Sequence, residues 1–481
     1  MTRRMGPNEN PGISSAIKKS NIETSATALT RTMSLSMPPP TDCVTSQAIP
    51  SVHVGTKSDT GSNYARNTEL ESLQYDGDEE EYPEGGATAW LVVLGAWCAM
   101  IPSMGLLNTV GVLQAWVSEN QLHGYSESNI GWIFSAYAFF LYIGGAQVGP
   151  IFDAHDIRYL IVPGSIGMVA AIMCMSVSTE YYQLLLSFGV LGGSSACLLF
   201  TPAVSAVGHW FCKRRALAIG IACTAGGLGG VIFPLLILYL APIIGFPWTI
   251  RVVGFVCLIM CIVACLLLKK RLPNNKHAGA SIDLKALKDS KYALTTLAVF
   301  LVEFAVFVPY SFISLYAIYA GVDRQKAYLI SALLNVGAIP GRALPGYVAD
   351  RFGVFNTMLA TSLTCATLIF ALWLTAARNE AAITAFAIVF GFWSGTGISL
   401  TPVCVGAVCK IEDYGKRNGT TFSIASFAAL IGIPAAGAVL EGSGGNYTGL
   451  IIFAGGLYLA AFTVFLVARI VGWGRDWRTI C

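Results

Sequence analysis

The feature that most constrains this chain is a series of apolar segments of about 20 residues. The series begins at Trp90 and continues almost to the last residue. A helix of that length crosses the hydrocarbon core of a bilayer, and it satisfies its own backbone hydrogen bonds where no water is present. The pattern therefore predicts an all-α membrane protein with the lipid bilayer as its surroundings.

Composition agrees with this prediction. Only 12% of the residues are charged, about half the fraction found in a soluble domain. The net charge of +3 is too small to indicate nucleic acid as a partner. The apolar segments predict twelve spans, at 90–113, 129–150, 159–178, 183–206, 217–240, 249–268, 292–317, 327–349, 357–376, 382–405, 419–440 and 449–471.

The first part of the chain has a different composition. It is rich in Ser, Thr, Asn and Pro and carries the acidic stretch DGDEEEYPE at 76–84, so it cannot bury a core and is expected to be a disordered tail. The predicted parts of the chain are this tail, a six-helix half, a linker, a second six-helix half and a short C-terminal tail, at 1–89, 90–268, 269–291, 292–471 and 472–481.

Lys and Arg are distributed unequally between the two sides of the predicted spans. With the N-terminal tail in the cytoplasm, 18 of them, Arg469 included, lie on the cytoplasmic side and 4 on the other. Cytoplasmic loops carry the excess of positive charge in membrane proteins. Both termini are therefore expected to be cytoplasmic, and the KRR stretch at 213–215 is expected to be a cytoplasmic turn between spans 4 and 5.

The chain contains an internal repeat. GPIFD at 149–153 resembles GYVAD at 346–350, KRR resembles GKRNG at 415–419, and Pro234 corresponds to Pro434. All three pairs are about 200 residues apart, which is too long a period for a solenoid. It fits duplication of a six-helix bundle, an arrangement typical of secondary transporters with the solute site between the halves.

Other classes of site have little support. GGLGG at 226–230 follows no strand and lacks the acidic residue of a dinucleotide site, so we interpret it as a helix-packing surface. Gly415 and Lys416 lack the glycine spacing of a P-loop. The 13 cysteines include no CxxC pair, and no metal or cofactor site is predicted. The chain is not expected to be an enzyme.

The repeated loops resemble the loop motif of the major facilitator superfamily. The better copy is Gly346–Gly353, GYVADRFG; the first copy has Asp156 where the family usually has Gly. Within the superfamily, three stretches resemble the fungal branch of the monocarboxylate porters: EGGATAW at 84–90, WFCKRRALAIG at 210–220, and FVPY at 307–310. The resemblance covers 90–475 and implies the twelve-helix fold of that superfamily.

The resemblance also implies a gate. In that family the motif Asp and nearby cations hold the cytoplasmic ends of the halves together. The matching residues here are Asp153, Asp350, Arg351, Lys213, Arg214 and Arg215.

We identify two ionisable side chains, Arg342 and Glu303, as lying well inside predicted spans. A charge at the bilayer centre costs about 2.5–3.5 kcal/mol, so such a residue is a candidate for function. The monocarboxylate porters carry an Arg at the position of Arg342, and the resemblance implies that it binds a carboxylate; the alternative is an Arg that extends to the membrane surface. Glu303 fits a proton carrier, because an apolar environment favours the protonated carboxyl, or a structural hydrogen bond between helices.

Two departures from the family argue against simple lactate or pyruvate symport. The family's span 8 Asp is Ala338 here, and its span 1 Lys is Asn108. Polar side chains inside the spans are further candidates for solute contact or for helix packing, and the ones we select are Asn108, Tyr137 and Asn335.

The sequence thus indicates a secondary active transporter of a small organic solute, working by alternating access. We expect a carboxylate-bearing metabolite, with efflux of a fungal secondary metabolite as one form. Uptake of a monocarboxylate or vitamin-like acid by proton symport and a non-transporting sensor are the alternatives. The cell membrane is the expected location, with the vacuolar membrane as the alternative, and an ancillary membrane protein remains open as a partner.

Overall fold

The structure, a computed structural model, describes residues 85–211, 214–271, 282–409 and 414–474. All of them belong to one compact unit, Leu70–Cys481. The predicted disordered tail, up to residue 84, lies outside the described residues, as do the middle of the predicted linker and the last part of the C-terminal tail.

The prediction of twelve spans is confirmed: twelve helical segments of the described residues are long and apolar enough to cross a bilayer. Several spans consist of more than one helical piece, because π-helical turns interrupt them. The N-terminal half contains α3 (Ala87–Met100), the π-helix η1 (Ile101–Gly105), α4 (Leu106–Asn108), α5 (Val110–Asn120), α6 (Glu127–Ile143), α7 (Gly145–Ala154), α8 (Arg158–Met175), α9 (Tyr181–Leu184), the π-helix η2 (Leu185–Gly192), α10 (Gly193–Gly208), α11 (Arg215–Ile244) and α12 (Phe246–Leu267).

The C-terminal half repeats this order after a short 3₁₀ helix. It contains η3 (Leu284–Lys288), α13 (Ser290–Tyr319), α14 (Arg324–Phe352), α15 (Val354–Leu368), the π-helix η4 (Ile369–Trp373), α16 (Glu380–Ala407), α17 (Tyr414–Gly442) and α18 (Tyr447–Trp473).

Helices extend past the apolar segments because polar residues cap them. The side chains of Asp289, Asp323 and Asn379 each accept a backbone N–H from the first turn of α13, α14 and α16, respectively. Such caps satisfy N–H groups that have no partner inside the helix. The caps lie in polar loops, so the ordered helices are longer than the segments that hydropathy marks.

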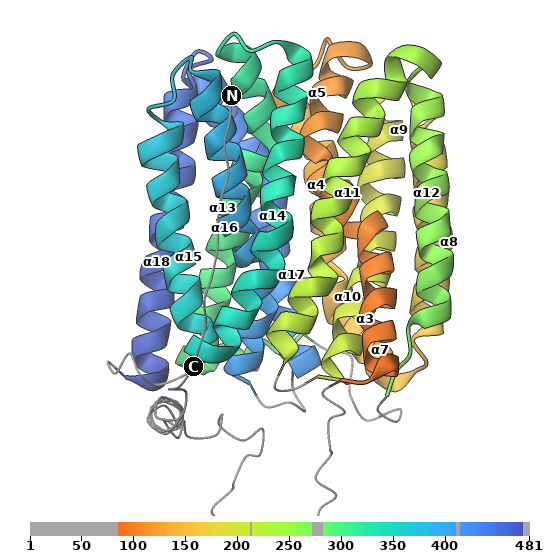
Figure 1. Cartoon of the computed structure of the whole chain (residues 1–481), viewed down its shortest axis with the longest axis vertical. Helices are drawn as coiled ribbons and strands as arrows, with labels where there is room; N and C mark the ends of the chain where they lie inside the picture. The colour runs from red at the N-terminus through yellow and green to blue at the C-terminus, as the bar shows by residue number, and fades with distance from the viewer. Residues whose placement is uncertain (1–84, 212–213, 272–281, 410–413, 475–481) are drawn as a thin grey trace, which may run out of the picture. The chain divides into compact units, whose positions relative to one another are not determined.

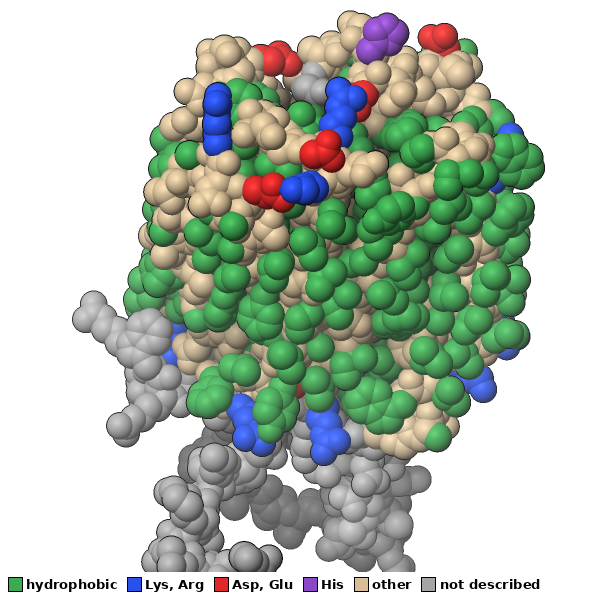
Figure 2. All heavy atoms as spheres, turned by 45° about the horizontal axis from the view of Figure 1, so that its top comes forward, with side chains coloured by type: hydrophobic (Ala, Val, Ile, Leu, Met, Phe, Trp, Pro, Cys, Tyr) green, Lys and Arg blue, Asp and Glu red, His purple; other side chains and the backbone are tan. Residues whose placement is uncertain are grey.

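Two faces of the molecule can be followed in Figure 1. The lower face is where α7 ends and α11 begins, and the upper face is where α5 ends and α6 begins. Figure 2 shows an apolar side wall, with Asp, Glu, Lys and Arg gathered on the upper face and Lys and Arg at the lower rim. This distribution is typical of a wall that contacts lipid.

The halves meet along two pairs of helices, α11 with α14 and α6 with α17. Counted as spans, these are 5 with 8 and 2 with 11. A shift of six spans exchanges the two pairs, which is the symmetry expected of a duplicated six-helix bundle. The sequence repeat is therefore also a repeat of contacts.

The two copies of the loop motif turn in different ways. Gly353 has φ of 91° between α14 and α15, a conformation that glycine adopts without steric cost. In the first copy, the carboxylate of Asp156 instead accepts the backbone N–H of Arg158 at 3.1 Å. The Asp that replaces the family's Gly thus stabilises its own turn through its side chain.

Candidate solute site

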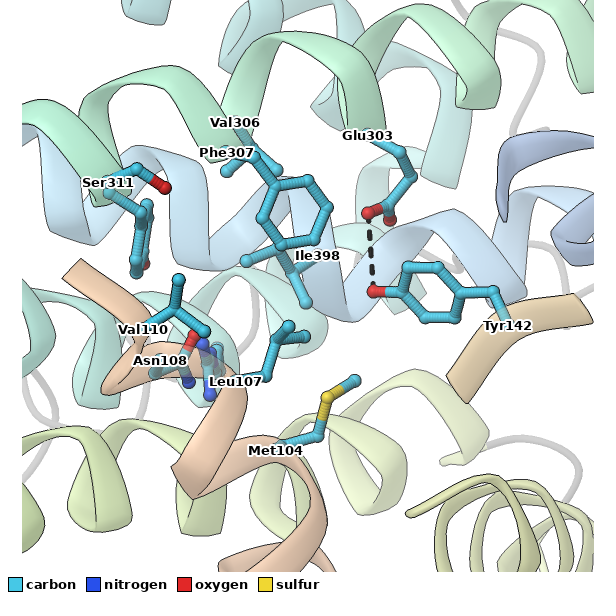
Figure 3. A pocket seen from close by; sticks show the side chains of 12 residues that line it. Met104, Leu107, Asn108, Val110, Tyr142, Glu303, Val306, Phe307, Ser311 and Ile398 are labelled. Atoms are coloured by element: carbon cyan, nitrogen blue, oxygen red, sulfur yellow. Dashed lines mark hydrogen bonds between the residues drawn. The ribbon is translucent and has the colours of Figure 1, made fainter. Parts of the chain in front are cut away.

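A small cavity lies between the two halves, near the middle of the spans (Figure 3). One face of α13 lines it with residues at helical spacing, Glu303, Val306, Phe307, Tyr310 and Ser311. Met104, Leu107, Asn108, Val110, Tyr142, Arg342 and Ile398 complete the lining. Its volume of about 20 Å³ holds about one water molecule. The halves must therefore separate before an organic solute can enter.

Arg342, the predicted binding residue of span 8, lines the cavity from α14. Its side chain is 2% exposed, and its guanidinium donates to the backbone carbonyl of Cys223 in α11 at 2.9 Å. Its Nε has no hydrogen-bond partner. A Cβ added to Gly226 would lie 2.5 Å from the guanidinium, so the glycine is needed for this approach. Arg342 therefore faces the cavity and does not extend to the membrane surface.

The same contact explains the GGLGG stretch of α11. A Cβ on Gly230 would lie 2.5 Å from the side-chain oxygen of Asn335, and one on Gly227 would lie 2.8 Å from Ile339. A Cβ on Gly220 would likewise lie 2.3 Å from the backbone oxygen of Arg342. These glycines let α11 approach α14 closely. The interpretation of GGLGG as a packing surface agrees with these contacts.

Asn108 and Asn335 lie together beside Arg342. Span 1 is irregular here, because α4 ends at Asn108 and the N–H of Val112 bonds to Thr109 rather than to Asn108. The carbonyl of Asn108 is thereby able to accept the side-chain N–H of Asn335, at 3.4 Å. The side-chain nitrogen of Asn108 has no partner. Asn108 lines the cavity, whereas Asn335 lies behind it, between Asn108 and Gly230.

Glu303 and Tyr142 meet across the halves at the other end of the cavity (Figure 3). The Tyr142 hydroxyl of α6 donates to Oε2 of Glu303 in α13 at 3.3 Å, and Oε1 has no partner. Glu303 is 1% exposed. Tyr142 was not predicted as a site residue, because a Tyr in an apolar span is common. It faces Glu303 only because of the way the two halves meet, which the sequence does not reveal.

Tyr137, selected from the sequence as a candidate for solute contact, lies away from the cavity. It stacks on Phe188 with ring centroids 4.7 Å apart, and its hydroxyl donates to the carbonyl of Ser103 at 2.8 Å. Ser103 lies in the π-helix η1. All these contacts are inside the N-terminal half, and Tyr137 does not line the cavity. It stabilises the irregular part of span 1.

On the lower face, Asp350 joins the halves. Its carboxylate accepts the backbone N–H of Leu217 at 3.3 Å, in the first turn of α11. A helix N-terminus carries partial positive charge, so a carboxylate there is favourable. Arg215 also crosses between the halves, with its guanidinium carbon 3.9 Å from the centroid of the Tyr414 ring. We call these two contacts the lower latch.

Of the other gate candidates, Arg214 and Arg351 lie next to the latch residues Arg215 and Asp350 in the chain. Arg351 stacks on Tyr347 of its own helix, at 4.5 Å, and Arg214 is exposed. Lys213 and the side chain of Asp153 are outside the described part of the chain.

Two groups beside the lower latch have shifted pKa values. Burial, together with the cations Lys270, Arg215 and Arg271, lowers the pKa of His209 to about 4. Burial raises the pKa of Tyr414, against the opposing effect of Arg215. Both side chains are therefore neutral at physiological pH.

On the upper face the halves meet through exposed acidic residues. Glu119 at the end of α5 lies 3.5 Å from the guanidinium of Arg324 and 3.4 Å from the hydroxyl of Tyr328, both in α14. Glu441 of α17 accepts the backbone N–H of Ser128, in the first turn of α6, at 3.4 Å. We call these contacts the upper latch.

Arg469 was counted among the cations of the cytoplasmic side and lies within the predicted span 449–471. Its side chain is fully buried in α18. Its Nε donates to the side-chain oxygen of Asn356, and its guanidinium donates to the carbonyl of Gly474. These two acceptors hold the charge inside the C-terminal half, close to the end of α18.

Comparison with known proteins identifies the family. A model of the Major Facilitator Superfamily matches residues 92–405. The chain belongs to this superfamily. Its major facilitator fold is also found in the crystal structure of the human organic anion transporter MFSD10 (TETRAN), with a TM-score of 0.61, 15% identity, and coverage of 79% of this chain and 98% of that one.

Curated major facilitator relatives come from fungi. MFS transporter asaE of Aspergillus flavus is 37% identical, covering 82% of this chain and 89% of the relative. Riboflavin transporter MCH5 of Saccharomyces cerevisiae is 32% identical, covering 89% and 87%. Aspyridones efflux protein apdF of Emericella nidulans is 35% identical, covering 76% and 75%. The chain is a multi-pass membrane transporter of this superfamily.

Proposed function

We propose that this transporter exports a small organic metabolite that carries a carboxylate or another anionic group. The observation that carries the proposal is Arg342, a buried guanidinium that faces the cavity between the halves with an unpartnered Nε. A guanidinium binds a carboxylate through two parallel hydrogen bonds and keeps its charge. The relative whose name describes aspyridone efflux supports export.

The latches supply the alternating access. Opening the lower latch exposes the cavity to one side, and opening the upper latch exposes it to the other. We place the lower face and both termini in the cytoplasm because Lys and Arg are concentrated there, and we place the protein in the cell membrane. The EGGATAW and WFCKRRALAIG stretches support membership of the monocarboxylate porters within the superfamily.

Proton-coupled uptake of a vitamin-like acid is the second candidate. The riboflavin transporter is similar over most of this chain, and Glu303 faces the cavity with an unpartnered oxygen. In this candidate Glu303 carries the proton. Glu303→Gln should then abolish accumulation driven by a pH gradient while leaving exchange of solute across the membrane.

Metabolite profiles of cells with and without the gene distinguish the two candidates. Export predicts that the anionic solute accumulates inside deleted cells and disappears from the medium, whereas uptake predicts the reverse. An unchanged distribution of every anionic metabolite would contradict both.

Arg342→Gln tests the carboxylate assignment at matched membrane levels. A charge-assisted hydrogen bond contributes about 1.5–3 kcal/mol, so apparent affinity for the solute should fall at least about tenfold. Arg342→Lys should retain part of it. The exposed Arg378 gives the control variant Arg378→Gln. Equal losses for a charged solute and its uncharged analogue would refute the assignment.

A further inference from the structure

The cavity has two polar ends that differ in chemistry. At one end, Arg342 and Asn108 each present a nitrogen that has no hydrogen-bond partner. Glu303 lines the other end with Oε1, an oxygen that also has no partner. Nitrogen donors therefore gather at one end and a carboxyl acceptor at the other.

These unpartnered atoms indicate a ligand because burying them is costly. Glu303 is 1% exposed and Arg342 is 2% exposed. A polar atom buried without a partner costs about 1–3 kcal/mol, and more if it is charged. Tyr142 satisfies only Oε2 of Glu303, and Cys223 satisfies only one nitrogen of Arg342. A solute that bonds to both ends would remove both costs.

Apart from the hydroxyl of Tyr310, which lies near Arg342 and also has no partner, the surface between the two ends is apolar. Val306 and Phe307 lie between Glu303 and Ser311 on α13, and Leu107 and Ile398 approach from the other side (Figure 3). Glu303 and Ser311 are eight residues apart in one helix, which is a rise of about 12 Å. Side chains reach into the cavity from both ends, so a solute body shorter than this rise, of about one or two rings, can connect the two ends.

We propose that the transported solute has two polar ends: an anionic group that binds Arg342 and Asn108, and a hydrogen-bond donor, such as a hydroxyl or N–H, that binds Glu303. An apolar body of one or two rings separates them. This inference rests on the proposed binding of an anion by Arg342 and adds a second determinant of specificity, the Glu303–Tyr142 pair.

Three naphthalene probes test the inference on the purified full chain in lipid nanodiscs. They are 6-hydroxy-2-naphthoate with both ends, 2-naphthoate with the acid alone, and 6-methoxy-2-naphthoate, which has an oxygen but no donor. The hydroxy acid should bind about tenfold more tightly than 2-naphthoate, since its hydroxyl gives Oε1 of Glu303 the hydrogen-bond partner that it lacks. The methoxy acid should show no such gain.

Variants then locate the determinant. Glu303→Leu should reduce the ratio of the two affinities to about one, with binding of 2-naphthoate retained, because only the hydroxyl contact is removed. Glu303→Gln keeps an acceptor oxygen and should give an intermediate ratio, which also covers the case that Glu303→Leu does not fold. Glu380→Gln, at an exposed carboxylate that pairs with Lys326, should leave the ratio unchanged.

The outcomes separate this inference from the function on which it rests. Equal binding of the hydroxy acid and 2-naphthoate to the wild type, lost in Arg342→Gln, would overturn the second determinant and leave the anion site standing. A tenfold ratio that persists in Glu303→Leu would also overturn it. Binding of neither acid would overturn the anion site and the inference together.

Discussion

The lower and upper latches both join the two halves, but they are built from different contacts. The lower latch uses a carboxylate on a helix N-terminus and a cation on the buried ring of Tyr414. The upper latch uses Glu119 and Arg324, whose side chains are 27% and 68% exposed. Each latch also includes an acid that accepts an N–H from the first turn of a helix in the other half, Asp350 or Glu441.

The two latches should therefore differ in how strongly salt weakens them. Exposed ion pairs contribute little and are screened by salt, whereas partly buried helix-terminus and cation–π contacts are screened less. We therefore expect the lower closure to be the firmer of the two and the upper closure to open first when ionic strength rises. The predictions below test the contacts on which that ranking depends.

The largest effect is expected from a bulky side chain introduced at Gly346, where α14 contacts the first turn of α11. A Cβ on Gly346 would lie 2.8 Å from the backbone oxygen of Ala216, and overpacking of this kind costs about 1–3 kcal/mol. Gly346→Leu should open the lower face and speed hydrogen exchange in the first turns of α11. Gly442 has nothing within 4 Å, so Gly442→Leu is the control. Unchanged exchange in Gly346→Leu would show that this contact does not hold the face closed.

Removing the charge of Asp350 should have the next largest effect. A carboxylate at a helix N-terminus contributes up to about 2 kcal/mol when partly buried. Asp350→Asn should raise exchange at the Leu217 amide several-fold, and Glu441→Gln should raise exchange at the Ser128 amide by less. An equal or larger effect in Glu441→Gln would reverse the ranking of the two latches.

Lowering the pH should destabilise the folded protein through His209, which lies beside the lower latch. Its pKa is lowered to about 4 in the folded protein, while an unfolded His titrates near 6.5. The unfolded state therefore binds more protons between these values, so stability is present above pH 6.5 and is lost as pH falls toward 4. The loss between pH 6.5 and 5.5 should be about 1 kcal/mol. Thermal unfolding of His209→Gln should lack this component, and an identical pH slope in the variant would exclude His209.

The smallest effect is expected at Glu119. Glu119→Gln removes an exposed ion pair with Arg324, which contributes about 0.2–1 kcal/mol. Exchange at the upper ends of α5 and α14 should rise slightly at low salt and match the wild type at high salt. A difference that persists at high salt would indicate that Tyr328, rather than the ion pair, holds Glu119.

Much of the fold could be predicted because the bilayer restricts the chain to helices of known length. Hydropathy gave the number and order of the spans. It did not give their ends, because caps such as Asp289 and Asn379 lie in polar loops. It also did not give the π-helical turns, whose hydrogen bonds have no recognisable signal in residues such as those of η1.

Prediction of the site depended on how unusual each residue is. Arg342 and Glu303 were selected because charges inside spans are rare, and both line the cavity. Tyr142 was missed and Tyr137 was selected, because the two are equivalent in an apolar span until their partners are known. The burial of Arg469 was not predicted, because nothing near it in the sequence indicates that Asn356, in another helix, accepts its hydrogen bond.

The glycine-lined contact between α11 and α14 has a consequence for the rate of transport. Gly220 meets the backbone of Arg342, whereas Gly226 and Gly230 meet the polar ends of the Arg342 and Asn335 side chains. Surfaces that interdigitate must unpack before they slide, and that unpacking forms part of the activation barrier. Two helices that meet at glycines have little to unpack, so they can change their relative tilt quickly even though they are in close contact. A methyl group at Gly220, which meets the backbone of α14 and not the guanidinium of Arg342, would therefore slow turnover more than it would weaken the binding of solute.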